Sequence, residues 1–190
     1  MLQDTKFDIC NRALVSAGCN TIASFDDGTT EAISAALFYQ SEVTRLISKH
    51  PWRFAKTTAD LDLIDEDAPG EWAAVWQIPT DVWRVLELTA SGAGVASYDM
   101  QADRIACDVV DYLKLVYLRQ VGESYFPPHF VTALEARLRY RFAFSISRQA
   151  TMAKEFKTDA MVELRDAKYI DATQTPAIRI RPTRFTGARL

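Results

Sequence analysis

The sequence predicts an α+β protein that is mainly α: a four-helix bundle with a small antiparallel β-sheet inserted between helices 2 and 3, plus an extended C-terminal arm. Two patterns support this prediction. Apolar residues recur at intervals of three and four in four long segments, as on the buried face of a helix. Between about residues 52 and 121 they form short, partly alternating runs bounded by turn residues, which is typical of strands. We therefore expect one domain over residues 1–171 and an arm over residues 172–190.

Length and composition fit such a domain. With 190 residues, of which 48% are hydrophobic, the chain is long enough for a sizeable core. No apolar run is long enough to span a membrane, and the first residues lack the pattern of a signal peptide, so we expect a soluble protein with no membrane partner. Three cysteines, Cys10, Cys19 and Cys107, without a CxxC pair favour a reducing compartment.

The first two helices are expected at about residues 5–17 and 29–49. Asp4 or Thr5 can cap the first helix, and Gly18 marks its end. The expected buried positions are Phe7, Cys10, Leu14 and Ala17 in the first helix and Ile33, Ala36, Leu37, Val43, Leu46 and Ile47 in the second.

A corner is expected directly after the second helix, at Pro51, Trp52 and Phe54. Pro51 has no amide hydrogen and disfavours a helical conformation at His50, so the helix has to end there. The aromatic residues that follow do not keep a helical period. They are therefore expected where helix packing changes to sheet packing.

The β-sheet is expected as one meander over about residues 52–121. Leu61 and Leu63 alternate with Asp60 and Asp62, as on a half-exposed strand. Further strands are expected around VWQIP, VWRVLELTA, RIACDVV and YLKLVYLRQV, with SGAGVAS as a turn-like stretch between the second and third of these.

Two more helices are expected at about residues 127–148 and 151–170. Pro127 and Pro128 suit the first turn of the third helix. The expected buried positions are Phe130, Leu134, Leu138 and Phe142 in the third helix and Phe156, Ala160, Leu164 and Ala167 in the fourth. From Ala172 onward there are two prolines and no helical period, which predicts an extended arm.

Charge is distributed unevenly along the chain. Residues 1–136 carry 10 Lys/Arg against 20 Asp/Glu, whereas residues 137–190 carry 12 against 5. A nucleic-acid-binding module that uses this basic C-terminal third is therefore the alternative function. The spacing of Arg137, Arg139, Arg141 and Arg148 scatters them around a helix, which favours surface or subunit ion pairs instead.

No motif predicts an enzyme, a cofactor or a metal site. His50 and His129 are the histidines, and the sequence has no GxSxG nucleophile motif. The acidic run from Asp60 to Glu71 departs from a calcium loop, because Ile64 and Asp65 stand at a ligand position and at the required glycine. LTASGAGVAS is an incomplete dinucleotide fingerprint and reads better as a hairpin loop.

The arm alternates apolar and basic residues in AIRIRPTRF. In an extended segment Ile178 and Ile180 point to one side and Arg179 and Arg181 to the other, which suits strand addition or groove docking on a partner. A disordered end is the alternative interpretation. The expected partner-binding residues of the arm are Ile178, Arg179, Ile180, Arg181, Pro182, Arg184 and Phe185.

Several of these segments resemble the podophage head-to-tail adaptor family, often called tail tubular protein A. The similar stretches are ICNRALVSAG, TIASFDDGTTEA, LISKHPWRFAKTTADL, WQIPTDVWRVLEL and FPPHFVTALEARLRYRFA. They cover most of residues 7–145, and HPWRFA after a long helix is the most specific of them. The resemblance is weakest after about Ala150 and in the arm.

The resemblance implies a structural virion protein without enzymatic activity, which forms a ring, dodecameric in this family, between portal and tail and lines the DNA conduit. The implied partners are the portal protein, neighbouring adaptor subunits, a tail tube or nozzle protein, and genomic DNA that passes through without sequence-specific binding. The implied location is the neck or tail of the virion, and the host cytoplasm during assembly. Trp52 and Phe54 would be core residues that hold the second helix against the sheet.

Overall fold

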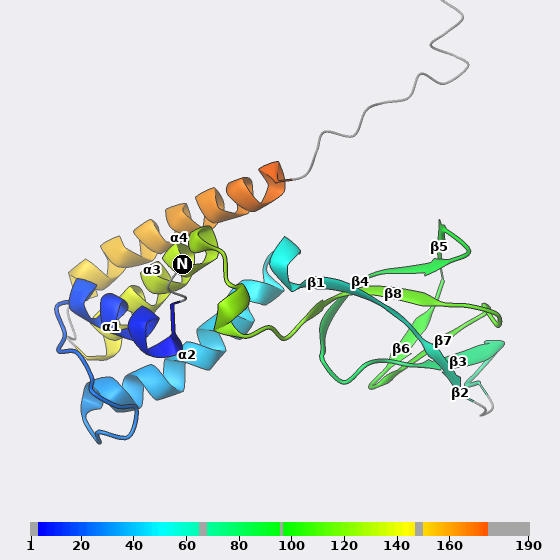
Figure 1. Ribbon diagram of the computed structural model, residues 1–190, viewed down its shortest axis with the longest axis horizontal. Coiled ribbons are helices and arrows are strands. Elements are labelled where there is room, and N and C mark those ends of the chain that lie inside the picture. The colour runs from blue at the N-terminus through cyan, green and yellow to red at the C-terminus, as the bar shows by residue number, and fades with distance from the viewer. Residues whose placement is uncertain (1–3, 65–67, 96, 147–149, 175–190) are drawn as a thin grey trace, which may run out of the picture.

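The computed structural model of the chain describes residues 4–64, 68–95, 97–146 and 150–174 (Figure 1). A helical body and a β-sandwich lie next to each other along the long axis of the molecule. The chain forms two helices of the body, enters the sandwich, and returns to form two further helices. The sandwich is therefore an insertion between the second and third helices.

Within the described ranges, the body consists of the helices α1 (Lys6–Ser16), α2 (Thr30–Ser48), α3 (Pro128–Ser145) and α4 (Ala150–Thr173). α3 lies at the centre of the body, because it contacts each of the other three helices. The side chains of Phe130, Leu134, Leu138 and Phe142 are fully buried on α3, as their four-residue spacing predicts. The helices thus pack around one central helix.

α1 begins with a capping box. The hydroxyl oxygen of Thr5 accepts a hydrogen bond from the amide of Asp8 at 3.2 Å, and the Asp8 carboxylate accepts one from the amide of Thr5 at 3.0 Å. These bonds satisfy amides that have no partner within the first helical turn. The bonds from Thr5 also lower the pKa of Asp8. Of the two expected caps, Asp4 and Thr5, it is Thr5 that caps the helix.

α4 packs against α3 through small residues. Ala153, Ala160 and Ala167 recur every seven residues along α4 and are almost fully buried. On α3, Ala136 and Ala143 have the same spacing and are also buried. Small side chains at a helix contact allow the two backbones to approach closely. The described part of α4 therefore lies along most of α3.

Two four-stranded antiparallel sheets form the sandwich in the described part of the chain. The first has the order β1-β8-β4-β5 and the second the order β2-β3-β7-β6. The strands are β1 (Lys56–Asp60), β2 (Asp62–Ile64), β3 (Ala74–Gln77), β4 (Val82–Ala90), β5 (Ala93–Gly94), β6 (Asp99–Gln101), β7 (Arg104–Cys107) and β8 (Lys114–Arg119).

The two sheets share one apolar core. Leu61 alone separates β1 from β2, so the chain passes from the first sheet to the second at this residue. The core residues include Leu61, Trp76, Leu88, Ile105 and Leu115, and all of them are buried. The sandwich therefore has a hydrophobic core of its own, separate from that of the helical body.

β4 belongs to both cores because it contains two irregularities of register. They fall between Val82 and Arg84 and between Val85 and Glu87. Trp83 and Leu86 pack against the core of the helical body, whereas Val82 and Val85 pack against the core of the sandwich. A bulge re-aims side chains in this way because it adds an unpaired residue to one strand.

The predicted fold class is wrong. The chain is not a four-helix bundle with one small sheet, because the described strands form two sheets with a separate core. The strands do not follow a meander either: β1, the first strand, pairs with β8, the last. Alternation shows which residues face a core, but it does not reveal which strand pairs with which. The stretch 91–97, expected as a turn, contains the short strand β5.

Part of the expected face of α2 is also wrong. Val43, Leu46 and Ile47 are buried as predicted, but Ala36 is exposed, and Ile33 and Leu37 are 52% and 67% exposed. In the first half of α2 the body is instead contacted by small residues and by Tyr39. The prediction failed because it centred the buried face on the large aliphatic side chains of Ile33 and Leu37, whereas small residues occupy the buried positions in this half of the helix.

Candidate functional site: the corner between helices and sandwich

The corner begins where α2 ends. α2 stops at Ser48, one turn before the exposed Pro51, and the chain then forms the short 3-10 helix η1 (Arg53–Ala55) before entering β1. Pro51 thus marks the turn from the helical body toward the sandwich, as its missing amide hydrogen predicts. The return path from β8 to α3 passes through a second short helix, η2 (Glu123–Tyr125).

Trp52 forms the buried centre of the corner. Its side chain is fully buried, and its indole Nε1–H donates a hydrogen bond to the carbonyl oxygen of Leu46 at 2.8 Å. The ring meets Phe130 of α3 edge-on at 5.1 Å between centroids, and it meets His50 at 4.8 Å. A buried indole that satisfies its donor contributes both apolar area and orientation. Trp52 therefore fixes the end of α2 to α3.

Phe54 extends the same cluster. Its ring lies 4.8 Å from Phe130 and 5.7 Å from Phe126, and Phe126 lies 4.8 Å from Phe130. Phe54 precedes β1, and Phe126 follows β8, so the cluster joins the two chain crossings between body and sandwich. The expectation that Trp52 and Phe54 hold α2 against the sheet needs correction, because both rings pack on α3.

Asp171, near the end of α4, packs against the corner. Its carboxylate is almost fully buried and is 3.1 Å from Nε2 of His50 and 3.7 Å from Nε2 of His129. It also accepts a hydrogen bond from the backbone amide of Arg53 at 3.3 Å. One carboxylate thus connects α4 with the end of α2, with η1 and with the start of α3.

This arrangement connects the segments that meet at the corner. A catalytic triad needs a hydroxyl or thiol on the far side of the histidine. The described contacts of His50 are instead the carboxylate of Asp171 and the ring of Trp52. Within residues 4–64, 68–95, 97–146 and 150–174, no group of three or more His, Cys, Asp or Glu side chains is placed to hold a metal ion.

A second buried charge ties α2 to α3. Glu42, 1% exposed, accepts hydrogen bonds from Nε and Nη2 of Arg137 at 3.2 and 3.1 Å. Its other oxygen accepts one from Nε of Arg141 at 2.7 Å. A buried carboxylate requires such partners, because an unpaired charge in a protein interior is strongly destabilising. Glu42 and Arg137 are therefore structural ion-pair partners.

The same ion pairs bear on the alternative function. Arg137 and Arg141 bind Glu42, and Arg139 binds Asp159 at 2.9 Å. The interpretation of these arginines as ion-pair partners fits this geometry, with partners inside the chain; Arg148 lies outside the described residues. Three of the guanidinium groups that a nucleic-acid site on α3 would use are thus already paired, which disfavours that alternative.

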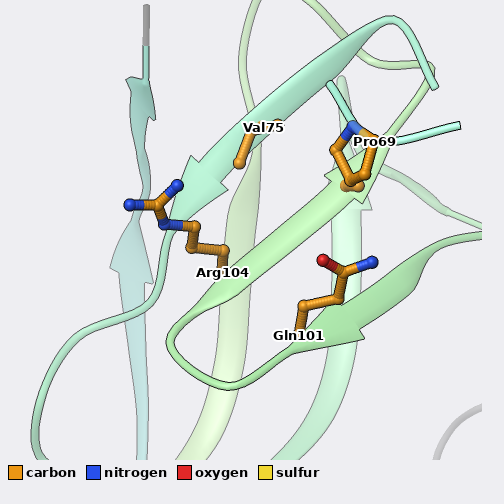
Figure 2. A pocket seen from close by; sticks show the side chains of 5 residues that line it. Pro69, Val75, Gln101 and Arg104 are labelled. Carbon is orange, nitrogen blue, oxygen red and sulfur yellow. The ribbon is translucent and has the colours of Figure 1, made fainter. Parts of the chain in front are cut away.

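The described part of the chain also has open hollows on the sandwich. Figure 2 shows one of about 180 Å³ on a face of the second sheet, lined by Pro69, Val75, Gln101, Arg104 and Ala106. A larger groove of about 550 Å³ lies between β4 and β6, and its lining includes Val82, Val85, Tyr98 and Met100. Both are open, and the larger one has mixed apolar and polar walls.

The sequence analysis missed two residues of the corner and the body, Glu42 and Asp171. Both lie on the buried face of their helix: Glu42 is one residue before Val43, and Asp171 follows Ala167 by four. An acid at a core position of a helical pattern is the signal that would have found them, because such an acid needs a buried partner. The partner-binding residues of the arm, Ile178 to Phe185, lie outside the described residues.

No protein-family model matches this sequence, and no curated protein is significantly similar to it. In the described part of the chain, the helices are too short or too polar to cross a membrane.

Proposed function

We propose that this chain is a structural virion protein, a head-to-tail adaptor that assembles as a ring between portal and tail and lines the DNA conduit. The family resemblance of the sequence motivates this proposal. The ring is dodecameric in that family, and the partners are the portal protein, neighbouring copies and a tail tube or nozzle protein. DNA passes through the ring without being read. The chain acts in the neck of the virion and carries no catalytic role.

One observation supports ring assembly in particular: two different apolar faces point away from each other. On α2, Ile33 and Leu37 are exposed, and on α4, Met161 and Tyr169 are 63% and 72% exposed. α2 and α4 pack on different sides of α3, and Figure 1 shows them on opposite sides of the body. A ring with cyclic symmetry needs such a pair of unlike surfaces, because each subunit contacts its neighbours head to tail.

The charges around the two faces are complementary. Lys154, Lys157, Arg165 and Lys168 lie along one side of α4, with Met161 between Lys157 and Arg165, although α4 also carries the exposed acids Glu155, Asp159 and Asp166. The loop before α2 and its first turn carry Asp26, Asp27 and Glu31. Opposite potentials across an interface steer association and set the register. The α4 face of one copy therefore suits the α2 face of the next.

The corner supports a rigid subunit. Trp52 and the buried carboxylate of Asp171 connect the ends of three helices at the point where the sandwich is attached. A ring that transmits the position of the portal to the tail requires such fixed geometry within each subunit. The proposal thus gives the corner an architectural role.

Electron microscopy of the protein, alone and mixed with the portal protein of the same virus, tests this function. We expect closed rings on the portal for the parent chain and none for Leu37→Glu or Tyr169→Glu, because each change places a charge in one of the two faces. Val110→Glu is the control, since Val110 is also an exposed apolar residue, at 51%, but lies on the sandwich. Rings that form equally well with all three variants contradict the assignment of the faces.

A further inference from the structure

The groove between β4 and β6 opens along the side of the sandwich. β6 is the last strand of the second sheet, and Figure 2 shows its partner β7 on one side of it. β4 pairs with β8 from Val82 to Thr89, with the two irregularities described above, but β5 pairs only with Thr89 and Ala90 of β4. From Val82 to Glu87, the second edge of β4 therefore has no strand partner among the described residues. Unpaired edges of this kind accept an additional strand from another chain.

Side chains of the sandwich core reach the surface in this groove. Val82 and Val85 belong to the edge of the core on the first sheet. On β6, Met100 is opposite the buried Ile105 in the antiparallel register, so both point toward the interior. Met100 is nevertheless 53% exposed, and Tyr98, on the same side, is 41% exposed. The groove is thus an incompletely covered flank of a hydrophobic core.

The sandwich as a whole is acidic. Residues 56–121, which form the sandwich and its loops, carry 12 Asp/Glu and 5 Lys/Arg, a net charge of −7. Asp103 lines the groove itself. The basic residue in the lining, Arg84, donates a hydrogen bond to the carbonyl oxygen of Ser48 at 3.1 Å and so is engaged with the body. A basic, partly apolar segment is the chemistry that complements this surface.

This chain contains such a segment beyond the described residues. Residues 175–190 include four arginines and no acid, and Ile178 and Ile180 alternate with Arg179 and Arg181. In a strand added to the groove, the isoleucines would point to its apolar side chains and the arginines away from them, toward the acidic surface of the sandwich. The alternation of this segment thus matches the apolar side chains of the groove, and its positive charge matches the negative charge of the sandwich.

We propose that the groove between β4 and β6 binds the C-terminal segment of a neighbouring copy as an added β-strand. This inference rests on the ring assembly proposed above, in which neighbouring copies lie side by side. Sixteen residues follow Gln174, and they span at most about 53 Å when extended at about 3.3 Å per residue. That reach is sufficient to cross to an adjacent subunit.

A peptide of residues 174–190, carrying a fluorescent label, tests the groove directly when its binding to the full-length protein is followed by anisotropy. We expect Met100→Glu and Tyr98→Glu to weaken binding at least about tenfold, because each change brings a carboxylate into the apolar wall. Val110→Glu is the matched control, because Val110 is 51% exposed on the sandwich but does not line the groove, and it should leave the affinity unchanged. A peptide with Asp at 178 and 180 should not bind.

Equal affinity of the peptide for the parent chain and both groove variants overturns the proposal, and so does an absence of binding to the parent chain. Each variant is first checked for an unchanged thermal melt, which the exposure of Met100 and Tyr98 makes the expected result.

Cysteine cross-linking tests whether the strand comes from a neighbour. Copies with Met100→Cys are mixed with copies with Ile180→Cys and oxidised mildly. We expect a linked pair of chains, absent from the parent chain and from a mixture in which Val110→Cys replaces Met100→Cys. A chain carrying both changes that links only within itself overturns the assignment to a neighbour.

These tests separate the groove from the proposed function, because the peptide assay requires neither portal nor ring. Binding at the groove without rings on the portal contradicts the adaptor function but not the groove. Rings on the portal together with peptide binding that ignores Met100→Glu and Tyr98→Glu contradict the groove but not the adaptor function.

Discussion

The indole of Trp52 and the carbonyl oxygen of Leu46 are joined by a hydrogen bond of 2.8 Å, so the residue that follows α2 closes back onto its last turn. Leu46 is one of the last four residues of α2. The carbonyl groups there lack the usual partner four residues further on, and that of Leu46 accepts a hydrogen bond from the capping amide of Lys49 at 3.2 Å. Trp52 adds a second hydrogen bond to this carbonyl from a fully buried position. The helix end and the start of the sandwich are therefore a single structural unit.

Trp52→Ala is expected to give an unfolded or aggregating protein. Removing a buried aromatic side chain costs about 3–5 kcal/mol, which is a large part of the total stability of a domain of about 5–15 kcal/mol. Circular dichroism during heating measures the effect, with Phe144→Ala as the control because Phe144 is largely exposed. A cooperative melt of Trp52→Ala within a few degrees of the parent chain refutes the role of Trp52 in the core.

Glu42→Gln is expected to destabilise the protein by about 3–5 kcal/mol, because it leaves the buried guanidinium of Arg137 without its counter-charge. Replacing both partners, as in Glu42→Leu with Arg137→Leu, should restore most of the stability. Urea unfolding measures both. In the exposed pair of Arg139 and Asp159, the matched change Asp159→Asn should cost less than about 1 kcal/mol. If Glu42→Gln lowers the free energy of unfolding by no more than Asp159→Asn does, the buried pair of Glu42 and Arg137 contributes no more to stability than an exposed ion pair.

Ala160→Leu is expected to cost about 1–3 kcal/mol, since Ala160 is fully buried on the face of α4 that packs on α3. The neighbouring change Met161→Leu provides the control, because Met161 points to solvent. Denaturant midpoints compare the two variants. If Ala160→Leu is as stable as Met161→Leu, the close packing of α3 and α4 is incorrect.

The free energy of unfolding is expected to fall as the pH rises above about 9. Burial raises the pKa of the Cys10 thiol from 9.0 to about 12, and burial also raises the pKa of Tyr39. Above pH 9 the unfolded chain loses protons that the folded chain retains, so deprotonation favours the unfolded state. The stabilisation is complete below pH 9 and is lost toward pH 12.

Urea midpoints between pH 8 and pH 10.5 measure this dependence. The variant Cys10→Ala with Tyr39→Phe lacks both groups and should show a shallower decline than the parent chain. Identical slopes for the parent and this variant would contradict the burial of the two groups.

Much of the local structure follows from the sequence alone. Four helices lie close to the predicted segments, because capping residues, prolines and apolar spacing act within a few residues of each other. Thr5 begins α1, and Pro51 prevents the continuation of α2. β4 runs over Val82–Ala90, the same residues as one of the expected strand segments. Effects of this range are encoded locally.

The arrangement of the strands could not be predicted in this way. β1 pairs with β8, and residues 56 and 118 face each other across the pair. This pairing depends on the whole intervening chain, and a single sequence does not encode it as a local pattern. Likewise, the contact of Asp171 with His50 joins residues 121 positions apart. The acid on a buried helix face was visible in the sequence, but its partner was not.

The arm and the ring are tested together by truncation after Gln174, which keeps α4 intact. The melt of the truncated protein should be nearly unchanged, because the described cores contain no residue of the arm. Rings on the portal should be lost, since the proposed contacts of the arm are absent. A truncated protein that assembles on portals with unaltered affinity contradicts the role of the arm.

The most direct measurement of the central claim is cryo-electron microscopy of the full-length protein mixed with its portal, with light scattering of the protein alone. The account predicts a monomer in isolation and a closed ring, dodecameric as in the resembling family, on one end of the portal. Each subunit in that ring should place its α4 face against the α2 face of the next. A stable dimer with twofold symmetry in isolation, or a portal that remains bare, would contradict the account.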